Sequence, residues 1–465
     1  MAINMLALSL TAARADEPST AAEVPLKKVV RVIDTFGKSV VGAIVVPWAI
    51  RSERGHGAWT VEGWGGSEPP KLTTDAAGEV TIPFPRFIDK ERETKPKALT
   101  CRVEHPDFAE TVYNDVAVVD AELPNEAVIT LHPGARVSIA AYAGDEPLDV
   151  THVHALWSSA SHWSHGSPVS GQAGQHGWRE LPRLPAGSEL LRLLYVPDDG
   201  PVMFSGVRQL ELADGERYKV RLEMRKACRI NGHIDDSVPR PVQNGRVVAE
   251  VNARANGDGR NTLDWRESAL IGPDGSFTLE AMPHGDLQVI ALCDGFMAES
   301  GEPPEFAADH ERQQVSAFNR PQVFPIADEQ HEITLKMTPT ADCLVRVLDP
   351  DRQPVQSATC SFWPNVGWWG GGSQIYCHPL YGTLAVLKNP DDIKTALKAD
   401  KLYSAMTDAE GVALVKNLPP QQGSTFVVSD EKVQLKVAGD QGYGHADLTA
   451  GEPNNVTVTL LEKRK

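Results

Sequence analysis

The sequence predicts an all-β protein built as a tandem array of about four antiparallel β-sandwiches. Short Val- and Ile-rich runs recur along the chain, separated by turns that draw on 38 Gly and 34 Pro. One strand–turn–strand pattern, opening with valine-x-valine and ending its first strand at an aspartate, occurs at residues 30–43 and again at residues 345–358. The spacing between repeats, about 95 to 115 residues, exceeds a solenoid period and matches a whole sandwich of roughly seven strands.

Each repeat is expected to open with a hairpin whose two strands are joined by a polar turn. In residues 29–46 that turn runs from Asp34 to Lys38, with Val, Ile and Ala on both sides. An Asp-Gly turn and an alternating strand follow later in each repeat, and a last strand closes it. These landmarks predict four domains in a row, like beads, at residues 26–133, 134–226 (the most degenerate), 227–339 and 340–465.

One segment has helical character, residues 389–402 of the fourth repeat. Asn389 can cap a helix, Pro390 suits its first position, and Ile393 and Leu397 share a face. The sequence therefore predicts one short helix inserted into the last sandwich.

These landmarks resemble the carboxypeptidase regulatory-like domain, also called the transthyretin-like or prealbumin-like sandwich, in exported bacterial proteins. The resemblance rests on the opening pattern at 30–43 and 345–358, the T-D-x-x-G turns at 74–80 and 407–412, and the His-Pro-Asp-Phe segment at 105–108. It implies an Ig-like or transthyretin-like fold and no catalytic residue. The family takes its name from peptidases with a separate zinc domain, but this sequence has neither a zinc-type His-x-x-Glu set nor His-Glu-x-x-His.

The N-terminus and the composition predict an exported protein. Residues 1–15 read as a signal peptide with an apolar core and an Ala-x-Ala end, and residues 16–25 as a linker. The six cysteines form no C-x-x-C pair and suit an oxidising compartment, with a connectivity that the sequence leaves open. We expect a periplasmic, cell-surface or extracellular location. The net charge of -17 argues against nucleic acid as a partner, and no further segment has the length of a membrane span.

The tryptophans form the first candidate site. All ten lie between the opening strands and the Asp-Gly turn of their repeats, many of them in Gly-rich stretches. Flat aromatic side chains on such loops can stack on sugar rings or anchor a protein partner. The alternative is that each tryptophan packs over the end of its own sandwich. The candidate binding residues are Trp59, Trp64, Trp163, Trp368 and Trp369.

A cluster of histidines in the second repeat forms the other candidate site. If residues 152–154 are a strand, His152 and His154 point to the same face, and His162 or His165 could complete a zinc or copper site from the loop. The alternative is an exposed Ser/Gly-rich loop in which histidine is incidental.

Together these patterns predict an exported, non-enzymatic scaffold or binding protein of the cell envelope. It would recognise carbohydrate or an envelope or extracellular protein through its Trp/Gly-rich loops, and would need no cofactor. The alternative function is a metal-binding or metal-dependent protein centred on the His-rich loop.

Overall fold

The computed structural model of the chain describes residues 26–52, 55–58, 69–88, 95–118, 126–159, 162–169, 172–173, 177–255, 258–301, 321–363, 384, 403–420, 424–429 and 442–460. Its regular elements over these residues are β-strands and one 3-10 helix, η1 (Val150–His152). The all-β fold class is thereby confirmed. The predicted signal peptide, the linker and the predicted helix at 389–402 lie outside the described residues.

Sandwich 1 pairs a three-stranded sheet, in the order β5-β1-β8, with a five-stranded sheet built on β3-β2-β6-β7. Its strands are β1 (Leu26–Asp34), β2 (Ile44–Ser52), β3 (Gly55–Ala58), β4 (Leu72–Thr73), β5 (Glu79–Phe84), β6 (Ala98–Glu104), β7 (Thr111–Ala117) and β8 (Glu126–Leu131).

Sandwich 2 differs because its strands join into one ten-stranded sheet through the pairing of β16 with β18. Its strands are β9 (Arg136–Ala143), β10 (Glu146–Pro147), β11 (Val153–Ser159), β12 (His162–Val169), β13 (Gln172–Ala173), β14 (Arg179–Glu180), β15 (Gly187–Tyr195), β16 (Met203–Ser205), β17 (Arg208–Leu212) and β18 (Arg217–Lys226).

Sandwich 3 pairs the sheet β22-β19-β26 with a six-stranded sheet built on β21-β20-β23-β24-β27. Its strands are β19 (Cys228–Ile234), β20 (Arg246–Ala255), β21 (Asp258–Leu270), β22 (Ser276–Met282), β23 (Gly285–Cys293), β24 (Phe296–Ala298), β25 (Gln322–Ile326), β26 (Gln330–Leu335) and β27 (Met337–Pro339).

Sandwich 4 pairs the sheet β31-β28-β34 with the sheet β30-β29-β32-β33. Its strands are β28 (Ala341–Leu348), β29 (Thr359–Trp363), β30 (Ser404–Met406), β31 (Val412–Leu418), β32 (Ser424–Ser429), β33 (Gly442–Ala446) and β34 (Asn454–Thr459). In every sandwich the first strand pairs in parallel with a strand near the end of the repeat: β1 with β8, β9 with β18, β19 with β26 and β28 with β34. All other pairs are antiparallel among the described strands, so the antiparallel architecture carries one parallel pair per repeat.

The predicted opening hairpin is wrong in its pairing. The turn chemistry is as expected, since Asp34 Oδ1 accepts hydrogen bonds from the backbone nitrogens of Phe36 and Lys38, both at 2.9 Å. However, β1 pairs with β5 and β8, whereas β2 pairs with strands of the facing sheet. The connection is therefore an arch that crosses from one sheet to the other. Two apolar strands around a polar turn look the same in sequence whether they pair or face each other.

The T-D-x-x-G motif fixes each arch in place. Thr74 Oγ1 donates to the carbonyl of Val40 at 2.8 Å and accepts from the backbone nitrogen of Ala43 at 2.9 Å. The equivalent hydroxyl of Thr407 makes the same two bonds in sandwich 4, to Val355 at 2.6 Å and from Ala358 at 2.9 Å. A single buried threonine thus joins the Asp-Gly turn to the arch, which explains why the two sequence motifs recur together.

The sandwiches are not independent beads, because three of them share hydrophobic cores. Four residues of sandwich 2 belong to the core of sandwich 3, where Phe204 packs edge-on against the fully buried Trp265 at 4.7 Å between ring centroids. Val248, Ile290 and other residues of sandwich 3 likewise join the core of sandwich 4. The core of sandwich 1 contains residues of that sandwich alone, among those described.

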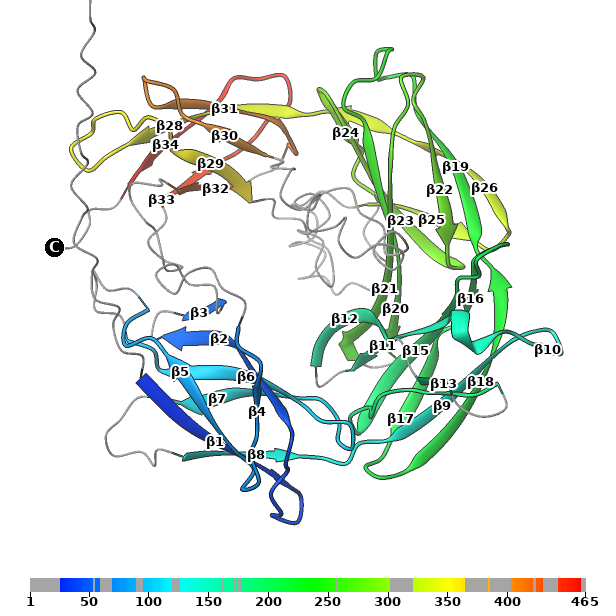
Figure 1. The fold of residues 1–465 in the computed structure, drawn as a ribbon. Coiled ribbons are helices and arrows are strands. Elements are labelled where there is room, and N and C mark those ends of the chain that lie inside the picture. The colour runs from blue at the N-terminus through cyan, green and yellow to red at the C-terminus, as the bar shows by residue number, and fades with distance from the viewer. Residues whose placement is uncertain are drawn as a thin grey trace, which may run out of the picture.

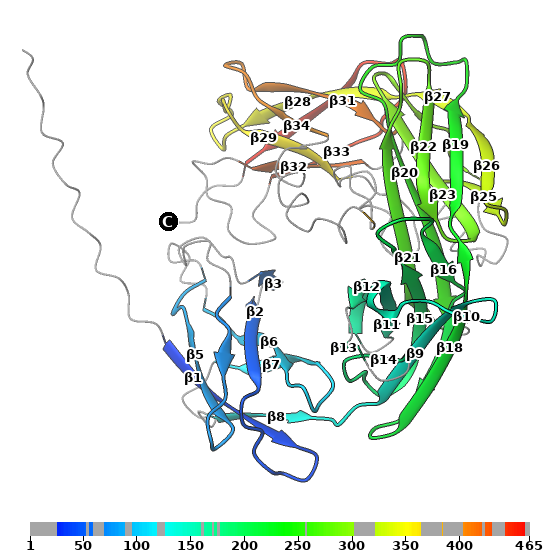
Figure 2. The same cartoon turned by 45° about the vertical axis from the view of Figure 1, so that its right-hand side comes forward.

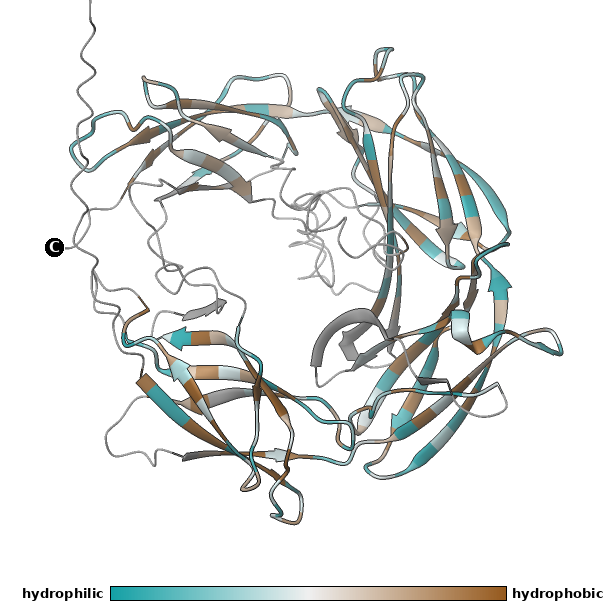
Figure 3. Cartoon of the chain, viewed as in Figure 1, coloured by the Kyte–Doolittle hydropathy of each residue, from teal (hydrophilic) through white to brown (hydrophobic). Residues whose placement is uncertain are grey.

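The four sandwiches follow one another around an open ring, with a gap between the described strands of sandwich 4 and those of sandwich 1 (Figures 1 and 2). In both views the strands β2, β11, β20 and β29 lie toward the inside, whereas β1, β19 and β28 lie toward the outside. Hydrophobic and hydrophilic residues alternate along many strands, as expected for sheets with one face in a core (Figure 3). No helix among the described residues is long and apolar enough to cross a bilayer.

Candidate functional site

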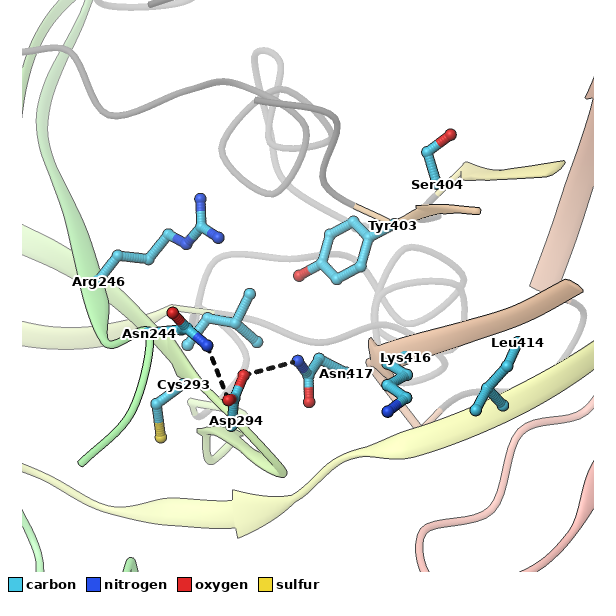
Figure 4. Close-up of a pocket in the computed structure, with 10 residues that line it drawn as sticks. Asn244, Arg246, Cys293, Asp294, Tyr403, Ser404, Leu414, Lys416 and Asn417 are labelled. Atoms are coloured by element: carbon cyan, nitrogen blue, oxygen red, sulfur yellow. Dashed lines mark hydrogen bonds between the residues drawn. The ribbon is translucent and has the colours of Figure 1, made fainter. Parts of the chain in front are cut away.

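A polar cavity of about 350 Å³ lies where sandwich 3 meets sandwich 4. Sandwich 3 contributes the start of β20, with Arg246, and the β23–β24 turn, with Asp294. Sandwich 4 contributes Tyr403, next to β30, and Lys416 and Asn417 from β31. Figure 4 shows these side chains gathered around the cavity. Because both sandwiches line the cavity, its shape depends on how the two are held together.

Backbone strain is concentrated at this cavity. Five non-glycine residues of the described chain have positive φ, and three of them line it: Asn244 at 52°, Tyr403 at 54° and Asn417 at 59°. Asparagine tolerates the left-handed region, but a bulky aromatic residue there is a genuine outlier. Such conformations persist only where the surroundings hold them, and they cluster at ligand clamps and active sites. This clustering marks the cavity as the candidate functional site.

Asn417 clamps the two sandwiches together. Its side-chain oxygen accepts a hydrogen bond from the backbone nitrogen of Gly295 at 2.8 Å, and its Nδ2 donates to Asp294 Oδ1 at 3.3 Å. Its own backbone nitrogen donates to Asp342 Oδ1 at 3.0 Å, which ties the residue to β28. The left-handed backbone of Asn417 therefore serves to present one amide to the β23–β24 turn.

The carboxylate of Asp294 is held from both sides. Asn244 Nδ2 donates to its Oδ2 at 2.8 Å, while the amide of Asn417 reaches its Oδ1 (Figure 4). Burial, followed by the negative charge of Asp294, raises the pKa of the neighbouring Cys293 thiol to about 11. Cys293 is therefore protonated at neutral pH and is a poor nucleophile. The polar side chains that remain around the cavity are chiefly hydrogen-bond donors: Arg246, Lys416, Tyr403 and Ser404.

A second cavity, of about 610 Å³, is also lined by residues of the clamp. It shares Asp294, Lys416 and Asn417 with the first, and it is also lined by Asp342 and Glu452. Most of the charged side chains that line this second cavity are acidic, whereas most of those that line the first are basic. Lys416 lines both cavities.

The five tryptophans predicted to bind fall largely outside the described residues. Trp163 lies in β12, but its side chain is not among those described, and Trp59, Trp64, Trp368 and Trp369 lie outside the described chain. Their binding role stays a prediction.

Three tryptophans outside the candidate set differ in their burial. Trp265 is fully buried and donates from Nε1 to the carbonyl of Ala281 at 2.9 Å, as the packing interpretation expects. Trp48 is 38% exposed, and Trp178 is half-buried with Lys219 Nζ 5.3 Å from its ring centroid.

The structure places two of the predicted metal ligands, His152 and His154, where η1 passes into β11. His152 ends the 3-10 helix η1 and is not on a strand, contrary to the expectation, because Asp149 caps a helical turn there. Its Nε2 lies 4.0 Å from Asp149 Oδ2. His154 follows on β11, and the side chains of His162 and His165 on β12 lie outside the described set. No group of three or more potential ligands occurs among the described residues.

The surroundings of His154 are unfavourable for a cation. Burial lowers the pKa of His154, and the positive charges of Arg179 and His152 lower it further. Arg179 is held there because its guanidinium donates to the carbonyls of Val150, at 2.9 Å, and Val153. His154 Nδ1 is buried without a hydrogen-bond partner. A neutral imidazole can ligate a metal, but the fixed guanidinium would repel the ion. The metal site stays a prediction.

Sequence reasoning missed the clamp and the cavity. The turn Asp294-Gly295 was visible as a turn signal, but nothing in the local pattern around Asn417 or Tyr403 marks a contact with another sandwich. Their importance arises from the relative placement of two sandwiches.

No protein-family model and no curated protein sequence matches the chain. Among solved structures, a Streptococcal ancillary pilin is 11% identical with a TM-score of 0.21, covering 70% of this chain and 99% of its own. The Bacillus anthracis TIE protein is 12% identical with a TM-score of 0.18, covering 96% and 76%. The minor pilin GBS52 of Streptococcus agalactiae is 10% identical with a TM-score of 0.23, covering 51% and 98%. Likenesses this remote carry no argument about function, and the resemblance to the carboxypeptidase regulatory-like domain stays a prediction.

Proposed function

We propose that this protein is an exported, non-enzymatic scaffold or binding protein of the cell envelope or the extracellular space. The observation that carries the proposal is the fusion of hydrophobic cores across sandwiches 2, 3 and 4. Shared cores fix neighbouring domains at set angles, which suits a frame that presents binding surfaces. The net charge of -17 and the N-terminal segment that resembles a signal peptide support export.

The proposed contact surface is the set of Trp/Gly-rich loops. The described strands that flank or contain the candidate tryptophans are β2 and β3, β12 and β29, all on the inner side of the ring (Figures 1 and 2). Loops that leave from one side of a rigid frame can engage one ligand together. The proposed ligands are carbohydrate or an envelope or extracellular protein.

The non-enzymatic part of the proposal has its own support. In the interdomain cavity Asp294 is engaged by two amides and the Cys293 thiol is protonated at neutral pH. Neither group is arranged as a general base or an activated nucleophile.

Glycan-array and pull-down binding of the purified protein tests the loop proposal. We expect that Trp368→Ala with Trp369→Ala abolishes binding, whereas Trp48→Ala, a partly exposed tryptophan outside the candidate set, leaves it within about twofold of wild type. Binding that survives the double replacement would overturn the assignment of these loops.

A further inference from the structure

We propose that the cavity between sandwiches 3 and 4 binds the carboxylate of an acidic sugar of one ring, a hexuronate. None of the candidate tryptophans is among the described residues that line this cavity. A volume of about 350 Å³ lies at the lower end of ligand-site sizes and suits a single sugar ring.

The charge of the lining favours an anion. Arg246 and Lys416 approach the cavity from different sandwiches, and Asp294 is the one negative side chain among the described lining residues. The described part of the lining therefore has a net positive charge, in a protein whose overall charge is -17. A guanidinium carries five N–H donors in a fork that matches a carboxylate, so contacts within the protein still leave donors for a ligand.

The main objection to an anionic ligand is repulsion by the Asp294 carboxylate, and the hydrogen bonds that this carboxylate accepts weaken the repulsion. Both of its oxygens already accept hydrogen bonds from amides, Oδ2 from Asn244 and Oδ1 from Asn417. These amide donors partly offset the negative charge of the carboxylate and hold it between Asn244 and Asn417 (Figure 4). A ligand carboxylate would then meet Arg246 and Lys416.

The rest of the lining suits a polyhydroxylated ring. The hydroxyl of Ser404 can both donate and accept, and the side-chain oxygen of Asn244 lies on the side away from Asp294 (Figure 4). Leu292 and Leu414 supply apolar surface for the C–H face of a sugar. The surroundings that hold Asn244, Tyr403 and Asn417 in left-handed conformations fix these groups before any ligand arrives, which lowers the entropic cost of binding.

Calorimetric titration of the full chain with D-glucuronate and D-galacturonate tests the proposal, with D-glucose and acetate as comparison ligands. We expect at least one uronate to bind about tenfold or more tightly than glucose or acetate, since only it offers both the charge and the ring. Arg246→Gln and Lys416→Gln should each weaken that binding by about tenfold. Arg346→Gln, an exposed arginine on β28, is the matched control and should leave binding unchanged.

Thermal melts check that each variant is folded. If Arg246→Gln fails to fold, Lys416→Gln alone tests the proposal, because Lys416 is exposed and its replacement leaves the core intact. Three results would each overturn the proposal: no uronate binding by the wild type, equal binding of glucose or acetate, or unchanged uronate binding by Lys416→Gln. Loss of glycan binding on replacement of Trp368 and Trp369 bears on the loops alone, so the two proposals fail separately.

Discussion

The side-chain oxygen of Asn417 accepts a hydrogen bond from the backbone nitrogen of Gly295 at 2.8 Å, joining β31 of sandwich 4 to the β23–β24 turn of sandwich 3. The carbonyl of Gly295 in turn accepts from the backbone nitrogen of Thr340 at 2.9 Å. The β23–β24 turn of sandwich 3 is thus bonded both to Thr340, which links β27 to β28, and to β31 of sandwich 4. The clamp and the shared core together hold the two sandwiches that line the cavity.

Replacement of Asn417 should measure the strength of the clamp. Asn417→Ala removes the side-chain amide. It also leaves alanine at a φ of 59°, where its Cβ is strained and its side chain makes no hydrogen bond that offsets the strain. We expect a loss of about 2 to 3 kcal/mol in unfolding free energy, from the lost hydrogen bonds and the backbone strain together. Asn417→Gly separates the two effects, because glycine accepts this backbone. Urea denaturation that finds Asn417→Ala as stable as wild type would contradict the clamp.

Thr407→Val should destabilise sandwich 4 by about 1 to 3 kcal/mol, since the isosteric change leaves the Val355 carbonyl and the Ala358 nitrogen without their partner. Thr407→Ser keeps the hydroxyl and is the control. Thr74→Val should act in the same way on sandwich 1. Thermal denaturation checks this, and equal losses for the Ser and Val variants would show that the hydroxyl is not responsible.

Gly411→Ala should cost more than Gly451→Ala. Both glycines have nearly the same φ, 72° and 73°, so both variants carry the same backbone strain of about 1 kcal/mol. A Cβ at Gly411 would also lie 2.8 Å from the carbonyl oxygen of Val347, whereas one at Gly451 would meet nothing within 4 Å. We expect a further loss of about 1 kcal/mol or more at Gly411. Identical denaturation midpoints for the two variants would refute this role of Gly411 in the arch.

Glu250 should make stability depend on pH. It is buried beside Arg266, whose Nη2 donates to Glu250 Oε2 at 2.9 Å. Burial nevertheless raises the pKa of Glu250, and the negative charge of Asp264 raises it further. A carboxyl whose pKa is higher in the folded state stabilises the fold below its unfolded pKa, and that contribution is lost as the pH rises through the folded value.

Relative to wild type, Glu250→Gln should therefore become progressively more stable as the pH rises from about 4 to 7. Melting temperatures of both proteins across this range give the answer. A difference that moves in the opposite direction would mean that the ion pair with Arg266 outweighs the cost of burial.

Metal analysis of the purified protein should find less than one equivalent of zinc or copper. The reason is the guanidinium of Arg179, whose charge acts on His154 within the predicted ligand cluster. One equivalent of metal that disappears in His154→Ala would favour the metal-dependent alternative over the scaffold.

The sequence predicted the parts of the fold that are governed by local chemistry. Asp34 makes the expected turn, and Thr74 and Thr407 recur because each must bond an arch at two backbone positions. Hydrophobic alternation also indicated the strands, although it could not show that β1 and β2 lie in facing sheets. Side-chain period reports which face is buried and carries no information on which strand is the partner.

The candidate cavity could not be predicted in this way. Asn417 and Tyr403 matter through their left-handed backbones and through contacts with a sandwich more than a hundred residues away, as in the bond from Asn417 to Asp294. The burial of Trp265 is similar, since its aromatic partner Phe204 belongs to a different repeat. Contacts of this kind follow from domain placement, which no local pattern encodes.

Differential scanning calorimetry of the full chain tests most directly whether sandwiches 2, 3 and 4 form one frame. Because their cores are shared, we expect these three to unfold in a single cooperative transition, with sandwich 1 free to melt separately. Asn417→Ala should split or broaden that transition. Four resolved transitions in the wild type, unaffected by Asn417→Ala, would show that the sandwiches are independent domains and would contradict the rigid frame.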